Sequence, residues 1–217
     1  MKLLLISASP RMEKSQTFLL AKEVLNGCKD RETAEIIHLF KYRIGFCHHC
    51  ECCHRKILYC PLKDDVHKVL KMMLEADGII LATPNYINQV TGMMKTLFDR
   101  SSHFIHCLRL MGKYVAGVVS SGSGEDKDVL SYLKHYANTC GAYYAGGVSA
   151  RSPVSKEALS DALKLGRRLC DAIEKKKEFA SQKKVIEGRK KHFGRLIQAR
   201  KDEWKEEYRY WVDKGWI

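Results

Sequence analysis

The sequence predicts an α/β fold, a five-stranded parallel sheet with helices on both faces. Short apolar runs alternate with helical patterns five times over residues 1–177, as expected of strands joined by crossover helices. The chain of 217 residues, 45% of them hydrophobic, is long enough for one such domain and an extension. No apolar run reaches membrane-spanning length. We therefore expect a domain at 1–177, with a cysteine-rich loop at 44–62, and a helical extension at 178–217.

The first strand and helix enclose a loop rich in hydroxyl groups. Residues 2–8 form a short apolar run that ends in small residues, as a buried parallel strand does. Ser15 is a natural N-cap for the helical pattern that follows. Hydroxyl and backbone N–H groups at a helix N-terminus bind phosphate, and Arg11 adds positive charge. GxGxxG and the Walker lysine are missing from the loop, which weighs against a dinucleotide fingerprint or a P-loop; the alternative is a capped helix with a polar entry.

The second and third strands end in two loops of contrasting chemistry. Residues 34–40 predict the second strand, and the cysteine-rich loop follows it. Asp64 is expected to cap the next helix, which has an apolar face. Residues 78–82 predict the third strand, which breaks at Pro84. Tyr86, near its carboxyl end, is either a wall for a flat ligand or a packing aromatic.

The remaining elements continue the alternation and lead into the extension. The pattern predicts helices at 92–100, 125–140 and 155–177, and strands at 114–119 and 143–148. Beyond residue 180, apolar side chains recur at helical spacing: Phe193, Ile197, Trp204, Tyr208 and Trp211. This apolar seam predicts that the extension packs on its own domain or on a partner subunit.

Five of the nine cysteines lie within fourteen residues. Four of them follow the pattern C-x2-C-x2-C-x6-C, and thiolates this close hold a soft metal centre or carry out redox chemistry. Three closely spaced cysteines and a fourth further along suit a [4Fe–4S] cluster. The predicted ligands are Cys47, Cys50, Cys53 and Cys60, and Cys52 could replace Cys53. The alternatives are zinc, which also accepts the histidines of this stretch, and a reduced loop without metal.

The chain carries a net charge of +13, most of which lies in one segment. Residues 174–201 contain eleven Lys and Arg and three Glu, a net +8. Such a run can bind nucleic acid but is more often the solvated face of a helix. An odd number of cysteines without a secretion signal indicates a reducing cytoplasm and weighs against a disulfide framework. We therefore expect a cytoplasmic protein that uses neither a membrane nor a nucleic acid as its partner.

Five strand–helix units favour the strand order 2-1-3-4-5, in which a ligand binds between strands one and three. The hydroxyl-rich loop after strand one and residues 84–88 after strand three meet there. One suits a phosphate and the other a flat ring, so flavin mononucleotide (FMN) is the natural ligand. The loop at 120–124 lies beside strand three and can also reach the ring. The cysteine-rich loop is expected at the same edge, close to the flavin of its own subunit or to one across a dimer.

Distinct motifs are spread along nearly the whole chain. They are Ser7-x-Ser9-Pro10-Arg11-x3-Ser15, the cysteine motif followed by Asp64-Asp65, Thr83-Pro84-Asn85-Tyr86, Gly92-x2-Lys95-x3-Asp99-Arg100, and the terminal Tyr-Trp and Gly-Trp pairs. Together they resemble the iron–sulfur flavoproteins, within the wider family of NAD(P)H-dependent FMN reductases. The resemblance implies a flavodoxin-like fold that binds FMN, homodimers or homotetramers, electron transfer and a [4Fe–4S] centre.

We therefore expect an FMN-dependent oxidoreductase and electron-transfer flavoprotein, linked to NAD(P)H or ferredoxin, with a [4Fe–4S] cluster. Hydride or electron transfer needs no protein nucleophile, so no acid or base residue is assigned. The predicted FMN contacts are Ser7, Ser9, Pro10, Arg11, Ser15, Gln16 and Thr17 for the phosphate, and Pro84, Asn85, Tyr86, Ile87, Asn88, Ser120, Ser121 and Gly122 for the ring. Three alternatives are a cluster-free NAD(P)H-dependent FMN or quinone reductase, a nucleic-acid-binding protein that uses the basic C-terminal helix, and a zinc-stapled module that senses redox state through Cys52 and Cys53.

Overall fold

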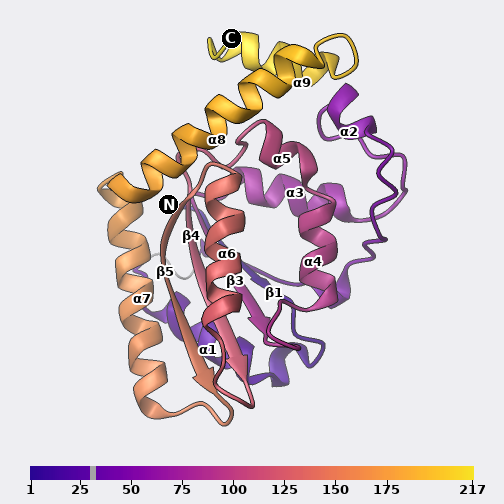
Figure 1. Cartoon of the computed structure of the whole chain (residues 1–217). Helices are drawn as coiled ribbons and strands as arrows, with labels where there is room; N and C mark the ends of the chain where they lie inside the picture. The colour runs from indigo at the N-terminus through magenta and orange to yellow at the C-terminus, as the bar shows by residue number, and fades with distance from the viewer. Residues whose placement is uncertain (30–32) are drawn as a thin grey trace.

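A computed structural model describes residues 1–29 and 33–217. Five parallel strands form one sheet in the order β2-β1-β3-β4-β5 (Figure 1). The strands are β1 (Leu3–Ser7), β2 (Glu35–His38), β3 (Gly78–Pro84), β4 (Tyr114–Ser121) and β5 (Tyr143–Arg151). The predicted fold class and strand order are therefore confirmed.

Helices cover both faces of the sheet. Those of the domain are α1 (Gln16–Asn26), α2 (Cys52–Arg55), α3 (Val66–Glu75), α4 (Gly92–Asp99), α5 (Ser102–His106), α6 (Lys127–Thr139) and α7 (Lys156–Glu174). On one face, α1 and α7 pack with Leu3 and Leu5 of β1; on the other, α3, α4 and α6 pack with Leu4 and Ile6. Alternate residues of one strand thus enter opposite cores, which explains the continuous apolar runs of the sequence. None of the helices within the described ranges has the length and hydropathy of a bilayer-spanning segment.

The ends of the strands differ from the predicted ones. The second strand ends at His38 rather than at residue 40, because a 3-10 turn, η3 (Leu39–Lys41), follows it. The last three strands continue through polar residues to Pro84, Ser121 and Arg151. Their extra residues still pair with parallel neighbours, so the sheet reaches further towards its polar edge than apolar patterning alone suggests.

Of the two predicted helix caps, Ser15 is the N-cap of its helix, whereas Asp64 lies one residue before the N-cap. Ser15 Oγ accepts a hydrogen bond of 3.0 Å from the backbone N–H of Phe18 at the start of α1. Asp64 Oδ1 accepts one of 3.2 Å from the N–H of Val66, the first residue of α3, although Asp65 occupies the N-cap position. Asp64 therefore satisfies one of the free N–H groups of α3 from one residue further upstream.

The extension folds back onto its own domain, which is one of the two predicted arrangements. Its helices α8 (Ala180–Ala199) and α9 (Lys205–Asp213) share a hydrophobic cluster with Cys107 and Leu108. Gln182 pairs with the edge strand β5 as a neighbouring strand would: it accepts from the N–H of Tyr144 at 2.7 Å and donates to its carbonyl oxygen at 2.9 Å, and thereby covers part of an open edge. Basic residues of α8 lie on its exposed side, as on a solvated helix face: Lys183, Lys184, Lys191 and Arg195.

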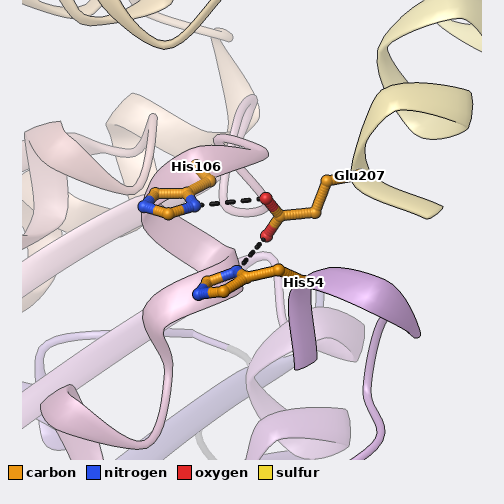
Figure 2. Close-up of side chains that lie close together, drawn as sticks. All are labelled: His54, His106 and Glu207. Atoms are coloured by element: carbon orange, nitrogen blue, oxygen red, sulfur yellow. Dashed lines mark hydrogen bonds and ion pairs between the residues drawn. The ribbon is translucent and has the colours of Figure 1, made fainter. Parts of the chain in front are cut away.

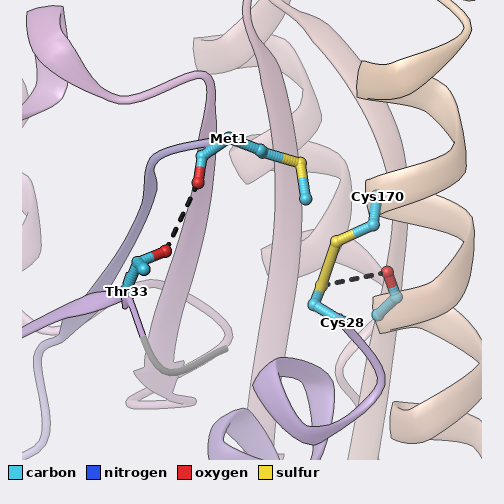
Figure 3. The surroundings of a disulfide bond; sticks show 5 residues. Met1, Cys28, Thr33 and Cys170 are labelled. Carbon is cyan, nitrogen blue, oxygen red and sulfur yellow. Dashed lines mark hydrogen bonds between the residues drawn. A yellow bond between two sulfur atoms is a disulfide. The ribbon is translucent and has the colours of Figure 1, made fainter. Parts of the chain in front are cut away.

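A disulfide bond joins Cys28, just after α1, to Cys170 of α7 (Figure 3). The cysteine count weighs against a disulfide framework, so this bond corrects that expectation. The two helices approach closely at Gly166, where an added Cβ would lie 1.9 Å from the carbonyl oxygen of Val24. This approach brings the two cysteine Cα atoms to 5.9 Å, within the usual range for a disulfide. Because 142 residues separate the two cysteines, no local spacing indicates the pair.

Candidate cofactor and metal sites

The carboxyl ends of β1, β3 and β4 meet at one edge of the sheet. The backbone N–H of Ala8 donates to the carbonyl oxygen of Ala82, and that of Asn85 to the carbonyl oxygen of Ser120, both at 2.8 Å. The hydroxyl groups of Thr17 and Ser120 lie 2.6 Å apart. The three segments predicted to contact FMN therefore lie together. We call residues 7–17 the phosphate loop and residues 84–88 the ring turn.

The phosphate loop is fixed by its own polar groups and one neighbouring loop. Ser9 Oγ accepts from the N–H of Arg11 at 3.4 Å, and Gln16 Oε1 accepts from the N–H of Val154 at 2.8 Å. The hydroxyl of Ser7 is buried without a hydrogen-bond partner among the described residues. A buried hydroxyl of this kind costs free energy unless a ligand satisfies it, and the free N–H groups at the start of α1 attract an anion. The loop therefore fits a phosphate group, and the Arg11 side chain is exposed and available to it.

The ring turn ends in a two-residue hairpin turn. Tyr86 and Gln89 exchange backbone hydrogen bonds of 3.0 and 3.1 Å, and between them Ile87 and Asn88 adopt positive φ angles of 52° and 54°. A β-branched residue in this conformation is strained, and such strain gathers at ligand sites. Ile87 is 98% exposed and Tyr86 is 52% exposed. Tyr86 is therefore not a packed strand-end aromatic, and it fits the wall of a flat ligand.

The segment at 120–122 closes the same edge from the side of β4. Ser121 is buried, and the carbonyl oxygen of Gly122 accepts a hydrogen bond of 2.8 Å from Arg151 Nε. The side-chain amide of Asn85 donates to the carbonyl oxygen of Glu125 at 2.9 Å, which ties the ring turn to the loop after β4. Both segments are held in place beside the position expected for the flavin ring.

Four cysteines line one cavity of about 350 Å³: Cys47, Cys50, Cys53 and Cys60. These are the four predicted metal ligands. Cys52 is not among the described residues that line the cavity; its sulfur instead accepts a hydrogen bond of 3.5 Å from Arg55 Nη2. The geometry therefore favours Cys53 over Cys52 as a ligand. Four sulfur donors in one cavity suit an iron–sulfur cluster, and they suit zinc as well, since His48 and His49 also line the cavity.

The surroundings of the cavity affect its thiols differently. Burial raises the pKa of the Cys53 thiol to about 12, and the negative charge of Glu207 adds to the shift. The pKa of Cys50 is lowered, chiefly because the backbone N–H of Cys52 donates to its sulfur. Thiolates are the ligands of metals, so a bound cation has to displace the proton of Cys53. Metal binding in this cavity is therefore expected to release protons.

Arg100 is a functional candidate that residue patterns alone did not select. It follows α4, is 6% exposed, and donates from Nη2 to the sulfur of Cys60 at 3.2 Å. Asp64 accepts two further hydrogen bonds from the same guanidinium, at 2.7 and 3.1 Å, and the carbonyl oxygen of Gly45 accepts one at 2.6 Å. The only signal for this arrangement in the sequence is that Asp64 and Arg100 both belong to motifs of the resembled family. The guanidinium is thus oriented by a carboxylate and faces a predicted metal ligand.

The cysteine cavity does not lie at the carboxyl edge of the sheet, which corrects the expectation for this loop. Thr91, the N-cap of α4, sits at that edge, where its hydroxyl donates to the carbonyl oxygen of Ala8 at 3.1 Å. Arg100, which contacts Cys60, lies past the opposite end of α4. Eight helical residues span roughly 12 Å. Figure 1 likewise shows α2 beside α5 and α9, at the other end of the molecule from the arrowheads of β4 and β5.

Comparisons with known sequences identify the family of the chain. A family model described as NADPH-dependent FMN reductase matches residues 1–154. An iron–sulfur flavoprotein of Archaeoglobus fulgidus is 29% identical over 194 residues, or 84% of each chain. A second protein of that name and organism is 42% identical over 123 residues, 56% of this chain and 60% of the relative. An iron–sulfur flavoprotein of Methanocaldococcus jannaschii is 40% identical over 128 residues, 58% of this chain and 64% of the relative. This chain thus covers less than two thirds of the length of the latter two relatives. The family model and the relatives together confirm the expected resemblance.

Solved structures share the fold. A flavone reductase aligns with a TM-score of 0.65 at 21% identity, over 80% of this chain and 63% of that one. A flavodoxin, WrbA-like protein from Agrobacterium tumefaciens aligns with a TM-score of 0.55 at 18% identity, over 81% of this chain and 99% of that one. At such identities the likeness concerns the fold, which is flavodoxin-like.

Proposed function

Because this chain belongs to the NADPH-dependent FMN reductase family, we propose that it is an FMN-dependent oxidoreductase and electron-transfer flavoprotein that also carries a [4Fe–4S] cluster. The proposal is supported by two candidate cofactor sites in one chain. One is the polar edge formed by the phosphate loop and the ring turn, and the other is the four-cysteine cavity. The names of the relatives support the second site.

FMN would be held at the carboxyl edge of the sheet. The hydroxyl groups of the phosphate loop and Arg11 would bind its phosphate, while the ring turn and residues 120–122 would border its isoalloxazine ring. Bound there, FMN supplies hydride and electron transfer. The part of the protein is to bind and orient the ring and to direct backbone donors towards its reduced, anionic form. No side chain has to act as a nucleophile.

The four cavity cysteines would hold the cluster, which supplies one-electron transfer. Arg100 would stabilise the sulfur of Cys60 most strongly in the reduced, more negative cluster, and would thereby raise its reduction potential. Since α4 separates the cavity from the ring turn of the same subunit, the geometry favours transfer to a flavin across a homodimer or homotetramer. NAD(P)H or a ferredoxin would supply the electrons, and the net charge of +13 suits an acidic protein partner.

An absorption spectrum of protein purified without oxygen tests the proposal, with iron and acid-labile sulfide counted on the same sample. Flavin bands with about four irons per chain are expected. Flavin without iron would leave the cluster-free FMN or quinone reductase. Stoichiometric zinc without iron would support the zinc-stapled module, and the absence of both flavin and iron after reconstitution would overturn the proposal.

Arg11→Ala is expected to raise the Kd for FMN about tenfold, since one charge-assisted contact to the phosphate is lost. The measurement is the quenching of FMN fluorescence on titration with flavin-free protein. Lys22→Ala is the matched control, because it removes one exposed positive charge from α1 outside the phosphate loop. Equal affinities of the two variants would remove Arg11 from the phosphate site.

A further inference from the structure

A buried carboxylate of the extension faces two stacked histidines of the domain from one side (Figure 2). Glu207 of α9 is 0% exposed. Its Oε1 lies 2.7 Å from His54 Nδ1, and its Oε2 lies 3.1 Å from His106 Nδ1. The two imidazole rings stack with their centroids 4.6 Å apart, and both also pack against Trp204.

This cluster is better described by hydrogen bonds than by a metal ion. Each imidazole faces its own carboxylate oxygen (Figure 2), whereas a metal requires its donors to converge on one point at about 2.0–2.2 Å. Two N–H donors satisfy both oxygens of the carboxylate, as a fully buried charge requires. Glu207 therefore fixes both rings through Nδ1. One of them, the ring of His54, lines the cysteine cavity.

The extension contacts the cysteine-rich loop at two further points. Glu206 Oε2 accepts a hydrogen bond of 2.7 Å from the backbone N–H of Ile57. Glu51 Oε2 accepts from Arg200 Nη2 at 3.0 Å and from Trp204 Nε1 at 3.1 Å. The contacted loop residues, Glu51, His54 and Ile57, thus all lie between the predicted ligands Cys50 and Cys60.

The loop has little structure of its own to fix its cysteines. Its one helix, α2, has four residues, and a helix this short is not stable by itself. His54 belongs to α2 and directly follows the predicted ligand Cys53. A contact that fixes His54 therefore fixes the direction in which the neighbouring sulfur points.

We propose that Glu207 is a positioning residue of the metal centre, through which the C-terminal extension orients α2 and holds Cys53 in the cysteine cavity. This inference rests on the proposed cluster. The buried negative charge of Glu207 also opposes the extra negative charge of a reduced cluster. Two properties follow from one residue: retention of the metal, and the midpoint potential of the centre.

The test compares Glu207→Gln with Glu203→Gln in the full chain loaded with iron. Glu203 belongs to the same extension, and its side chain is 63% exposed and paired only with Arg200 among the described contacts. In E207Q, extraction of iron by a chelator is expected to be about tenfold faster or more. The midpoint potential is expected to become more positive, since a repulsive charge is gone. E203Q is expected to match the wild type in both properties.

Two further measurements keep the inference open to refutation. Glu207→Asp keeps the charge but shortens the reach, so its potential should stay near that of the wild type while iron is still extracted faster; this variant carries the test if E207Q does not fold. In metal-free protein, iodoacetamide should alkylate Cys53 faster in E207D, which keeps the negative charge beside the thiol, than in E203Q. Equal alkylation of E207D and E203Q, together with equal extraction and potential in E207Q and E203Q, would overturn the positioning role. Faster alkylation in protein that never assembles iron would support the positioning role and would reject only the proposed cluster.

Discussion

Arg100→Ala is expected to lower the free energy of unfolding by roughly 3–5 kcal/mol, because it leaves the Asp64 carboxylate buried without its charged partner. In the folded protein the side chains of Arg100 and Asp64 are 2% and 7% exposed, and Nη1 lies 2.7 Å from Oδ2. The measurement is urea unfolding monitored by circular dichroism. Lys95→Ala is the control: it breaks the exposed pair with Asp99, which should cost about 1 kcal/mol or less. A loss for the Arg100 variant as small as that of the control would contradict the prediction.

The deficit of the Arg100 variant should also depend on pH. Burial by itself raises the pKa of Asp64, but hydrogen bonds from Arg100 and from the N–H groups of Gly45 and Val66 outweigh it and hold the pKa below its ordinary value of 3.8. A carboxyl whose pKa is lowered on folding stabilises the fold above its unfolded-state pKa, and this contribution is lost as the pH falls through the folded value. Without Arg100 the desolvation remains and the pKa rises. The difference in unfolding free energy between wild type and variant should therefore shrink as the pH is lowered from neutrality past 3.8, and a constant difference would contradict this account.

The sheet could be predicted because its physics is local. The central strands of a parallel sheet are buried on both faces, so residues such as Leu3 to Ile6 form a continuous apolar run. The strand order follows from five repeated strand–helix units. Polar strand ends such as Ser121 and Arg151 were beyond this reasoning, because pairing with a parallel neighbour, rather than burial, keeps them in the sheet. The Cys28–Cys170 disulfide depends on how closely α1 and α7 pack, which no spacing records.

The sequence likewise predicted only part of the two candidate sites. The phosphate loop and the cysteine motif have signals in the sequence, since a helix cap and a cysteine spacing are both local patterns. The side chains that orient the cysteines do not. Glu207 meets His54 and His106 across 153 and 101 residues. Its spacing of three and four residues from Trp204 and Trp211 places it on the apolar face of the helix, but this spacing does not indicate which residues it contacts. The predicted position of the cysteine cavity was wrong, because the loop that leaves β2 runs along the length of α4 before its cysteines come together.

Trp211→Ala tests whether the extension is an integral part of the fold, and it is expected to lower the free energy of unfolding by about 3–5 kcal/mol. Trp211 is 1% exposed, its Nε1 donates to the carbonyl oxygen of His106 at 3.2 Å, and its ring packs edge-on against Trp216 at 5.0 Å. A small residue at position 194 makes room for it, since an added Cβ on Gly194 would lie 3.1 Å from the ring.

The control for this variant is Val212→Ala, the next residue of α9, which is 45% exposed and should change the free energy of unfolding by about 0.5 kcal/mol or less. Both variants are measured by urea unfolding of the full chain. If α9 were only loosely attached, the two variants would behave alike. If the prediction holds, iodoacetamide should also alkylate Cys53 faster in the Trp211 variant than in the Val212 variant, both measured without metal. The reason is that α9 carries Glu207 and, with it, the contact to His54.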